Sequence, residues 1–194
     1  MNILFERFPD TVVVHGKEYE VVTDFREWIK LHEFLSAAQK FTAQTLYFVL
    51  EWYVGKSPEN KADAVRALQD FMLARDIHDT EEEDGNTSGG KTAWMKPSFS
   101  FSQDAVCIYA AFRSVYGIDI TTIPYMHWWQ FLALFEGLPE NTEIKERIYY
   151  RTVDLNEVES KEERKRIKKI KKRIALKAQG RRKVDDYAIG DVFS

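Results

Sequence analysis

One segment of the chain matches a motif that binds nucleotide phosphates. Residues 85–92 read Gly-Asn-Thr-Ser-Gly-Gly-Lys-Thr and fit the pattern G-x-x-x-x-G-K-[ST]. In nucleotide hydrolases a buried strand leads into this loop and a helix N-terminus follows it, so that backbone N–H groups point at the phosphates. Here residues 79–84 are polar and acidic, and Pro97 follows Thr92 closely. We therefore interpret the match as a coincidence within a Gly- and Ser-rich surface loop, at about residues 77–96, that we expect to be mobile.

The chain carries no pattern typical of a metal site or a catalytic nucleophile. Its four histidines lack metal-ligand spacing, and Cys107 is the single cysteine. We interpret Cys107 as a small core residue, and His32, which falls on an apolar helix face, as a hydrogen-bonded core or rim histidine. No nucleophile elbow is present, and no spacing singles out a pair of carboxylates for acid–base catalysis. The sequence therefore predicts a protein that is not an enzyme and that has no cofactor and no metal.

The most aromatic stretch of the chain runs from Tyr125 to Phe135. Tyr, Trp and Phe are the side chains that anchor protein–protein interfaces. The candidate partner-binding residues in this stretch are Tyr125, His127, Trp128, Trp129 and Phe131. The alternative is that the stretch is the central core helix, and both interpretations hold if one ring edge reaches the surface.

A second candidate surface is a basic helix near the C-terminal end of the sequence. Residues 161–183 contain 13 Lys and Arg but only 2 Asp and Glu. Three isoleucines at helical spacing form a narrow apolar stripe on it. The candidate partner-binding residues here are Ile167, Ile170 and Ile174 of the stripe, with Lys168 and Lys172.

Four interpretations of this basic helix are open. Its charge is sufficient to bind nucleic acid, although residues 161–183 include no aromatic side chain to stack on a base. A membrane-surface helix would carry Trp, Phe or Leu on its apolar face. In the third interpretation the isoleucines dock on another helix while the charges meet an acidic protein surface. In the fourth, the helix is simply a solvated charged face.

The elements that position these residues are mostly helical. Residues 12–22 predict a short hairpin in which Gly16 supplies a positive φ, and Asp24 is placed to cap the helix that follows. The apolar run 41–54 is long for a strand, which favours a buried helix. Ser57 and Pro58 predict the start of the next helix, with Ser as the cap and Pro in the first turn.

The second half of the sequence continues the helical pattern. Ser102 is placed to cap a helix that closes at Gly117, and an aromatic helix ends at Gly137. We therefore expect a mainly α fold: a compact helical domain with a small N-terminal β-hairpin and a basic C-terminal helix. Residues 1–158 form the predicted domain, and residues 159–194 form a basic helical extension.

The charge of the chain divides along the same boundary. The 194 residues carry a formal net charge of −3. Residues 161–194 hold 13 basic and 5 acidic side chains, whereas the other residues hold 15 and 26. A single cysteine excludes an internal disulfide framework, and no uncharged apolar run is long enough to predict a membrane span. The basic helix therefore predicts docking on an acidic surface of the same chain or of a second copy.

Three blocks of the sequence resemble the bacteriophage gene product fifteen family. The most specific block is His-Trp-Trp-Gln-Phe-Leu-Ala-Leu-Phe-Glu-Gly-Leu-Pro-Glu at residues 127–140, continued by Ile-Tyr-Tyr-Arg-Thr-Val-Asp-Leu at 148–155. The opening Leu-Phe-Glu-Arg-Phe-Pro at 4–9 and the segment 108–120 are similar as well. The resemblance covers roughly residues 1–178, interrupted at 79–96.

This resemblance implies a function in long-tailed phages. Family members are encoded between the major tail protein and the tape-measure protein, and products from that position are thought to be tail-assembly chaperones. The implied partners are the tape-measure protein, the tail-tube protein or both, with self-association possible and nucleic acid or membrane partners not expected. The implied place of action is the host cytoplasm during phage assembly. The competing interpretation is a nucleic-acid-associated phage protein that binds through residues 161–183.

Overall fold

The computed structural model describes residues 2–38, 40–75 and 98–177. Within them the chain forms two strands and seven helices, in the order β1 (Thr11–Val14), β2 (Lys17–Glu20), α1 (Phe25–Ala37), α2 (Ala43–Leu50), α3 (Lys61–Met72), α4 (Ala105–Tyr116), α5 (Trp128–Glu136), α6 (Glu143–Thr152) and α7 (Lys161–Ile174). The mainly α fold with an N-terminal hairpin and a basic C-terminal helix is confirmed. The predicted loop at 77–96, with its nucleotide-loop match at 85–92, lies outside the described residues, as do residues 178–194.

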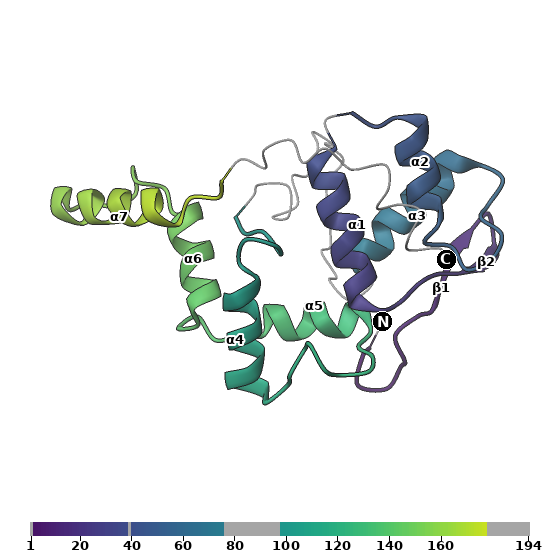
Figure 1. Ribbon diagram of the computed structural model, residues 1–194, viewed down its shortest axis with the longest axis horizontal. Coiled ribbons are helices and arrows are strands. Elements are labelled where there is room, and N and C mark those ends of the chain that lie inside the picture. The colour runs from purple at the N-terminus through teal and green to yellow at the C-terminus, as the bar shows by residue number, and fades with distance from the viewer. Residues whose placement is uncertain (1, 39, 76–97, 178–194) are drawn as a thin grey trace.

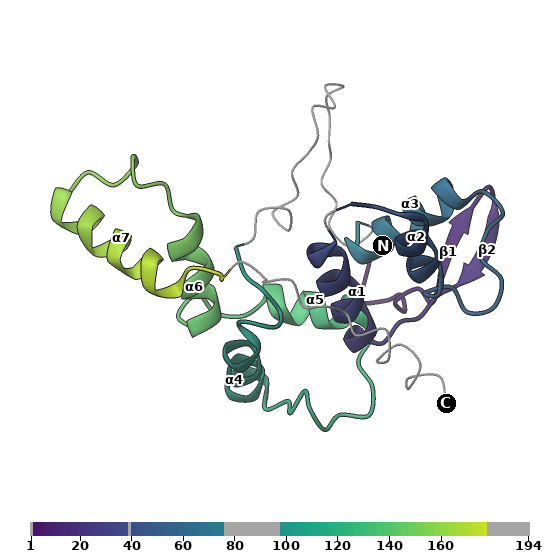
Figure 2. The ribbon, with the colours of Figure 1, turned by 45° about the horizontal axis from the view of Figure 1, so that its top comes forward.

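The elements are spread along the long axis of the molecule, but not in chain order (Figure 1). The hairpin lies at one end beside α2 and α3, α1 and α5 occupy the middle, and α6 carries α7 at the opposite end. A second view shows the same arrangement, with α7 projecting beyond the rest of the protein (Figure 2). The hairpin packs against α3, α1 packs against α5, and α7 packs against α6.

The hairpin forms as the sequence predicts. β1 and β2 pair antiparallel, with Val14 opposite Lys17. The two residues between the strands, His15 and Gly16, both have positive φ, 52° and 74°. Positive φ at both positions is characteristic of a type I′ turn, whose twist matches that of the strands, and glycine adopts this conformation without steric cost.

Two predicted helix boundaries in the first half are wrong. The helix predicted over 41–54 ends at Leu50, and the backbone at Trp52 and Val54 instead hydrogen-bonds to residues at the end of the hairpin. α3 begins at Lys61 rather than near Pro58, because the Asn60 side chain accepts hydrogen bonds from two N–H groups of the first turn. At the end of α2, long-range backbone hydrogen bonds override the helical pattern of the sequence. At the start of α3, the Asn60 cap replaces the predicted Ser57 cap.

The predicted cap of α4 is also wrong. The Ser102 hydroxyl donates to the carboxylate of Glu33, at 2.8 Å. Asp104 occupies the N-cap position, but its side chain makes no hydrogen bond to the N–H groups of the first turn. Its carboxylate is held elsewhere, in a contact between helices that is described below. At the other end of α4, Gly117 adopts the left-handed conformation predicted for it, with φ 69°.

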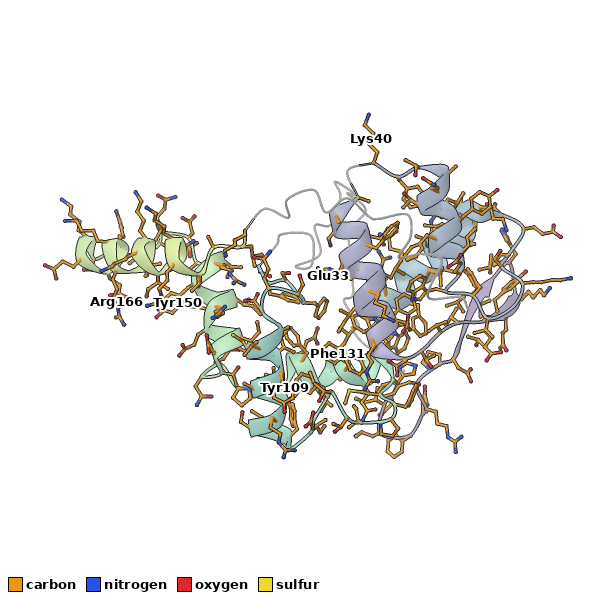
Figure 3. The ribbon with its side chains drawn as sticks, in the orientation of Figure 1. Glu33, Lys40, Tyr109, Phe131, Tyr150 and Arg166 are labelled. Carbon is orange, nitrogen blue, oxygen red and sulfur yellow. The ribbon has the colours of Figure 1, made fainter. Side chains whose placement is uncertain are left out.

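The core is built from aromatic rings gathered around α5. The Phe131 ring stacks on Phe25 of α1 and on Phe112 of α4, with centroids 4.8 and 5.1 Å apart. Figure 3 shows Phe131 between α5 and α1, in the interior of the molecule. Trp128 stacks on Phe131, Trp28 stacks on Trp128, and all these rings are buried. The apolar face of α5 is therefore enclosed in the core, whereas Gln130 and Glu136 remain exposed.

Candidate interaction surface

The aromatic candidates of the sequence divide between the core and the surface. Trp128, Trp129 and Phe131 are buried, so their side chains contact other parts of this chain and offer no surface to a partner. Tyr125 is 53% exposed, and its hydroxyl makes a 2.8 Å hydrogen bond with Thr23. The core interpretation therefore describes this segment, and Tyr125 is its exposed aromatic side chain.

The two tryptophans of α5 fasten it to α3. The Trp128 indole N–H donates to the carbonyl of Met72 at 2.9 Å, and that of Trp129 donates to the carbonyl of Phe71 at 2.7 Å. Both carbonyls belong to the last turn of α3, where four carbonyls have no partner within the helix. Trp128 thus gives the Met72 carbonyl a partner, and Trp129 adds a second donor to the Phe71 carbonyl, which also accepts from the Ala74 N–H.

His127 has a structural role at the start of α5. Its Nδ1 accepts a hydrogen bond from the Trp129 N–H, so the proton of the neutral ring is on Nε2, which lies 3.0 Å from the Pro9 carbonyl. Burial lowers the pKa of His127 below its ordinary value, more than the Pro9 carbonyl and Asp10 raise it. A neutral imidazole therefore caps α5 and holds the N-terminal segment against it.

The C-terminal arm, residues 143–177, contains α6, α7 and the residues that join and follow them. Its apolar stripe faces α6: Ile167 is 3% exposed, and Ile170 and Ile174 are half-buried. The Lys171 ammonium donates to the Val153 carbonyl at 2.6 Å, and Arg151 donates to the carbonyl of Ile174 at 2.8 Å. The isoleucine stripe thus docks on a helix of the same chain.

A buried carboxylate attaches this arm to the rest of the protein. Asp104 is fully buried and receives two hydrogen bonds from Arg151, at 2.6 and 2.9 Å, and one from Arg147, at 3.1 Å. Burial alone would raise the pKa of Asp104, but the two guanidinium groups and the Ser100 N–H bind the charged form and lower it. Asp104 is therefore an anionic clamp between the start of α4 and α6.

This cluster of Asp104, Arg147 and Arg151 is not apparent from the sequence. The spacing of Arg147 and Arg151, four residues apart on α6, is the local signal that both can point the same way. Asp104 lies more than 40 residues earlier, and at its position a capping role is the ordinary expectation. The pairing of Asp104 with the two arginines depends on how α4 and α6 cross. The periodicity of the sequence carries no information about that crossing.

The outward face of α7 is strongly cationic. Lys168 and Lys172, two of the candidate residues, are exposed on it. The exposed basic side chains of the arm are Lys161, Arg164, Lys165, Arg166, Lys168, Lys169, Lys172, Arg173 and Lys177. The acidic residues of α7 lie in its first turn and basic ones in its last, where each sign is favoured by the helix dipole.

A groove of about 510 Å³ separates α6 from α7 on one side of the arm. Figure 3 shows Tyr150 and Arg166 where the two helices meet. The groove is lined by Glu143, Glu146, Arg147 and Tyr150 of α6 and by Arg166, Ile170, Arg173 and Ile174 of α7. The α6 side thus carries two carboxylates and the Arg147 guanidinium, which pairs with Glu143, and the α7 side carries two guanidinium groups. Apolar side chains lie between them.

The described residues contain no arrangement typical of a metal centre. Within residues 2–38, 40–75 and 98–177, no three His, Cys, Asp or Glu side chains gather as metal ligands. Cys107 is buried, as expected of a core residue. His32 is half-buried with its ring edge-on to Phe101, and its Nδ1 has no hydrogen-bond partner in the described part of the chain, so the predicted hydrogen bond is not seen at this atom. No described helix is long and apolar enough to cross a membrane.

Comparison with known proteins gives one match. The model of a family described as Bacteriophage Gp15 protein matches residues 4–176. Neither the curated proteins nor the solved structures include a significant match to the chain. The matched range includes the aromatic core and almost all of the C-terminal arm.

Proposed function

The chain belongs to the bacteriophage Gp15 family, and on this premise we propose that it is a non-enzymatic tail-assembly chaperone. Family membership supports the coarser description, a phage structural or assembly protein. The proposed partners are the tape-measure protein, the tail-tube protein or both, bound in the host cytoplasm during phage assembly. A tape-measure protein is a long amphipathic chain that aggregates unless its exposed stripes are covered.

The observation that carries this proposal is the cationic outer face of the C-terminal arm. Ile167 is already covered by α6 and Ile170 and Ile174 are partly covered, so what the helix mainly offers to a partner is charge, from side chains such as Lys168 and Lys172. Positive potential on a projecting helix attracts acidic segments of a partner over about a Debye length and accelerates association. The adjoining groove adds apolar contact beside that charge. The arm therefore suits a client whose helices have acidic faces.

Co-expression with the tape-measure protein of the same phage tests the proposal. We expect the soluble fraction of the tape-measure protein to rise in the presence of the wild-type chain. The double charge reversal Lys168→Glu and Lys172→Glu should remove most of that gain, because both side chains are exposed and their loss leaves the fold intact.

The matched control reverses two exposed lysines on the body of the protein. Lys40→Glu with Lys56→Glu changes the net charge by the same amount, and Lys40 projects into solvent away from the arm (Figure 3). The control variant should protect the tape-measure protein as well as wild type does. If the tape-measure protein is equally insoluble with and without the wild-type chain, the chaperone proposal is wrong.

The same cationic face supports a second candidate function, binding of nucleic acid. Nine exposed basic side chains on residues 161–177 are enough to neutralise several phosphates. A salt titration of binding to random duplex DNA separates the two functions. Tight binding at physiological salt that is lost with Lys168→Glu and Lys172→Glu would favour nucleic acid. Weak binding that is unchanged by deletion of residues 161–194 would exclude it.

A further inference from the structure

The N-terminal segment presents two large apolar side chains to solvent. Leu4 is 82% exposed and Phe5 is 86% exposed. Their backbone is nevertheless held in a turn, because the N–H groups of Phe5 and Glu6 donate to the Asn2 carbonyl and that of Leu4 donates to the Asn2 side chain. An ordered turn that displays Leu and Phe together is typical of an anchor for a hydrophobic groove.

This anchor lies far from the groove of its own chain. Phe8 stacks on His127 with ring centroids 5.0 Å apart, and Pro9 is bonded to the same histidine, so the segment is tethered at the start of α5. The start of α5, where Phe8 and Pro9 are held, lies in the middle of the molecule, whereas α7 lies beyond α6 at one end (Figures 1 and 2). Residues 4–7 span at most about 14 Å when extended, so the groove they can fill belongs to another molecule.

The groove between α6 and α7 has the chemistry to accept this anchor. Ile170, Ile174 and Tyr150 offer apolar contact for Leu and Phe side chains. Immediately after Phe5 come Glu6 and Arg7, both exposed. On the α6 wall Glu143 is paired with Arg147 at 2.6 Å, which leaves the exposed Glu146 to complement Arg7. On the α7 wall the guanidinium groups of Arg166 and Arg173 complement Glu6.

We propose that the groove between α6 and α7 binds residues 4–7 of a second copy of this chain. The contact is head-to-tail, since the anchor and the groove are different surfaces at different places on the molecule. Such heterologous contacts leave one anchor and one groove free in every dimer, so copies add into chains or closed rings. This inference goes beyond the chaperone proposal and is tested with the purified chain alone.

Sedimentation velocity over a concentration series measures the association. The interface is small, so the wild-type chain should be mostly monomeric at about 5 μM and show larger species at about 200 μM. The anchor variant Leu4→Asp with Phe5→Asp should remain monomeric throughout. The control Tyr47→Asp changes another ring that is largely exposed (72%), on α2 and outside the groove, and should associate like wild type.

Mixing two defective variants distinguishes a head-to-tail contact from a symmetric one. The anchor variant keeps its groove, and the groove variant Ile170→Asp keeps its anchor, so each alone should stay monomeric. Their mixture should form 1:1 dimers and nothing longer, because only one productive contact is possible. Circular dichroism confirms that the groove variant is folded.

A charge exchange tests the contact without changing an apolar residue. Arg7→Glu and Glu146→Arg both alter exposed side chains, and each alone should weaken association about tenfold. The chain that carries both changes should regain association close to wild type. A wild-type chain that is monomeric at every concentration, an anchor variant that associates like wild type, or a mixture without dimers would each overturn the proposal.

Discussion

Helices α5 and α7 each carry a prominent apolar stripe, but they are packed in different ways. α5 is enclosed by α1, α3 and α4, and its Trp128, Trp129 and Phe131 are buried. In the part of the chain that the structure describes, α7 packs mainly against α6, and Ile167 is its one fully buried side chain. The enclosed helix serves the fold, whereas the helix packed on one side leaves most of its surface free for a partner. The most conspicuous aromatic block of the sequence is therefore structural, and the less conspicuous arm is the better candidate for function.

The largest difference between the two regions should appear on truncation of a core ring. Phe131→Ala removes a fully buried ring that stacks on rings of two other helices, and should lower the free energy of unfolding by about 3–5 kcal/mol. Urea denaturation measures the change. Tyr125→Ala, at the exposed aromatic of the same segment, should cost less than about 1 kcal/mol. Equal losses in the two variants would contradict the division between core and surface.

The attachment of the arm should be sensitive to the charge of Asp104. Asp104→Asn leaves two arginines facing a neutral amide and should destabilise the protein by about 3 kcal/mol at pH 7. Because the pKa of Asp104 is lowered in the folded state, its carboxylate stabilises the protein above the unfolded pKa, and this contribution disappears as the pH falls through the folded pKa. The free energies of unfolding of wild type and variant should therefore become similar in strong acid.

The matched control for Asp104 is an exposed ion pair. Asp70 lies 3.2 Å from Arg75, and both side chains are largely solvent-accessible. Asp70→Asn should change the stability by less than about 1 kcal/mol. A loss of stability as large as that of Asp104→Asn would show that burial does not determine how much these ion pairs contribute to stability.

A smaller and more local effect is expected within the arm. Ile167→Ala should cost about 2 kcal/mol, less than a core ring, because α7 is covered on one side. Hydrogen exchange should accelerate in α7 and leave α5 unchanged, since a helix with one neighbour can open by itself. Lys168→Ala, its exposed neighbour, should alter neither helix. Faster exchange throughout the protein would show that the arm and the core unfold together.

The smallest effect concerns the histidine that caps α5. Since burial lowers the pKa of His127, the unfolded chain binds a proton first, so stability is intact above about pH 6.5 and falls as the pH drops toward 5. His127→Asn keeps an N-cap acceptor that does not titrate and should weaken this pH dependence. Burial also lowers the pKa of His32, which accounts for the pH dependence of stability that remains in this variant. Thermal unfolding at pH 7 and pH 5 measures this pH dependence of stability. If stability falls equally between the two pH values in wild type and variant, His127 does not cause the pH dependence.

Local signals in the sequence were sufficient for several parts of the fold. The turn at His15 and Gly16, the cap at Asp24 and the end of α4 at Gly117 each depend on a backbone conformation or hydrogen bond within a few residues. The basic helix was also predicted, since its basic composition and its stripe of isoleucines are local features. Such signals fail where a distant partner competes, as at Trp52, whose carbonyl accepts from Val22 and draws the chain out of its helix.

Residue type and spacing determine which segments of this protein are helical and which face of each helix is apolar. They also determine that the last described helix is basic. Tertiary packing decides which of these side chains are buried, exposed or paired. It turns Asp104 from an expected cap into a clamp for Arg147 and Arg151, encloses the tryptophans and leaves Leu4 and Phe5 exposed. The physical reason is that burial and charge pairing depend on distances between segments far apart in the chain, whereas helical periodicity reports only on neighbours along it.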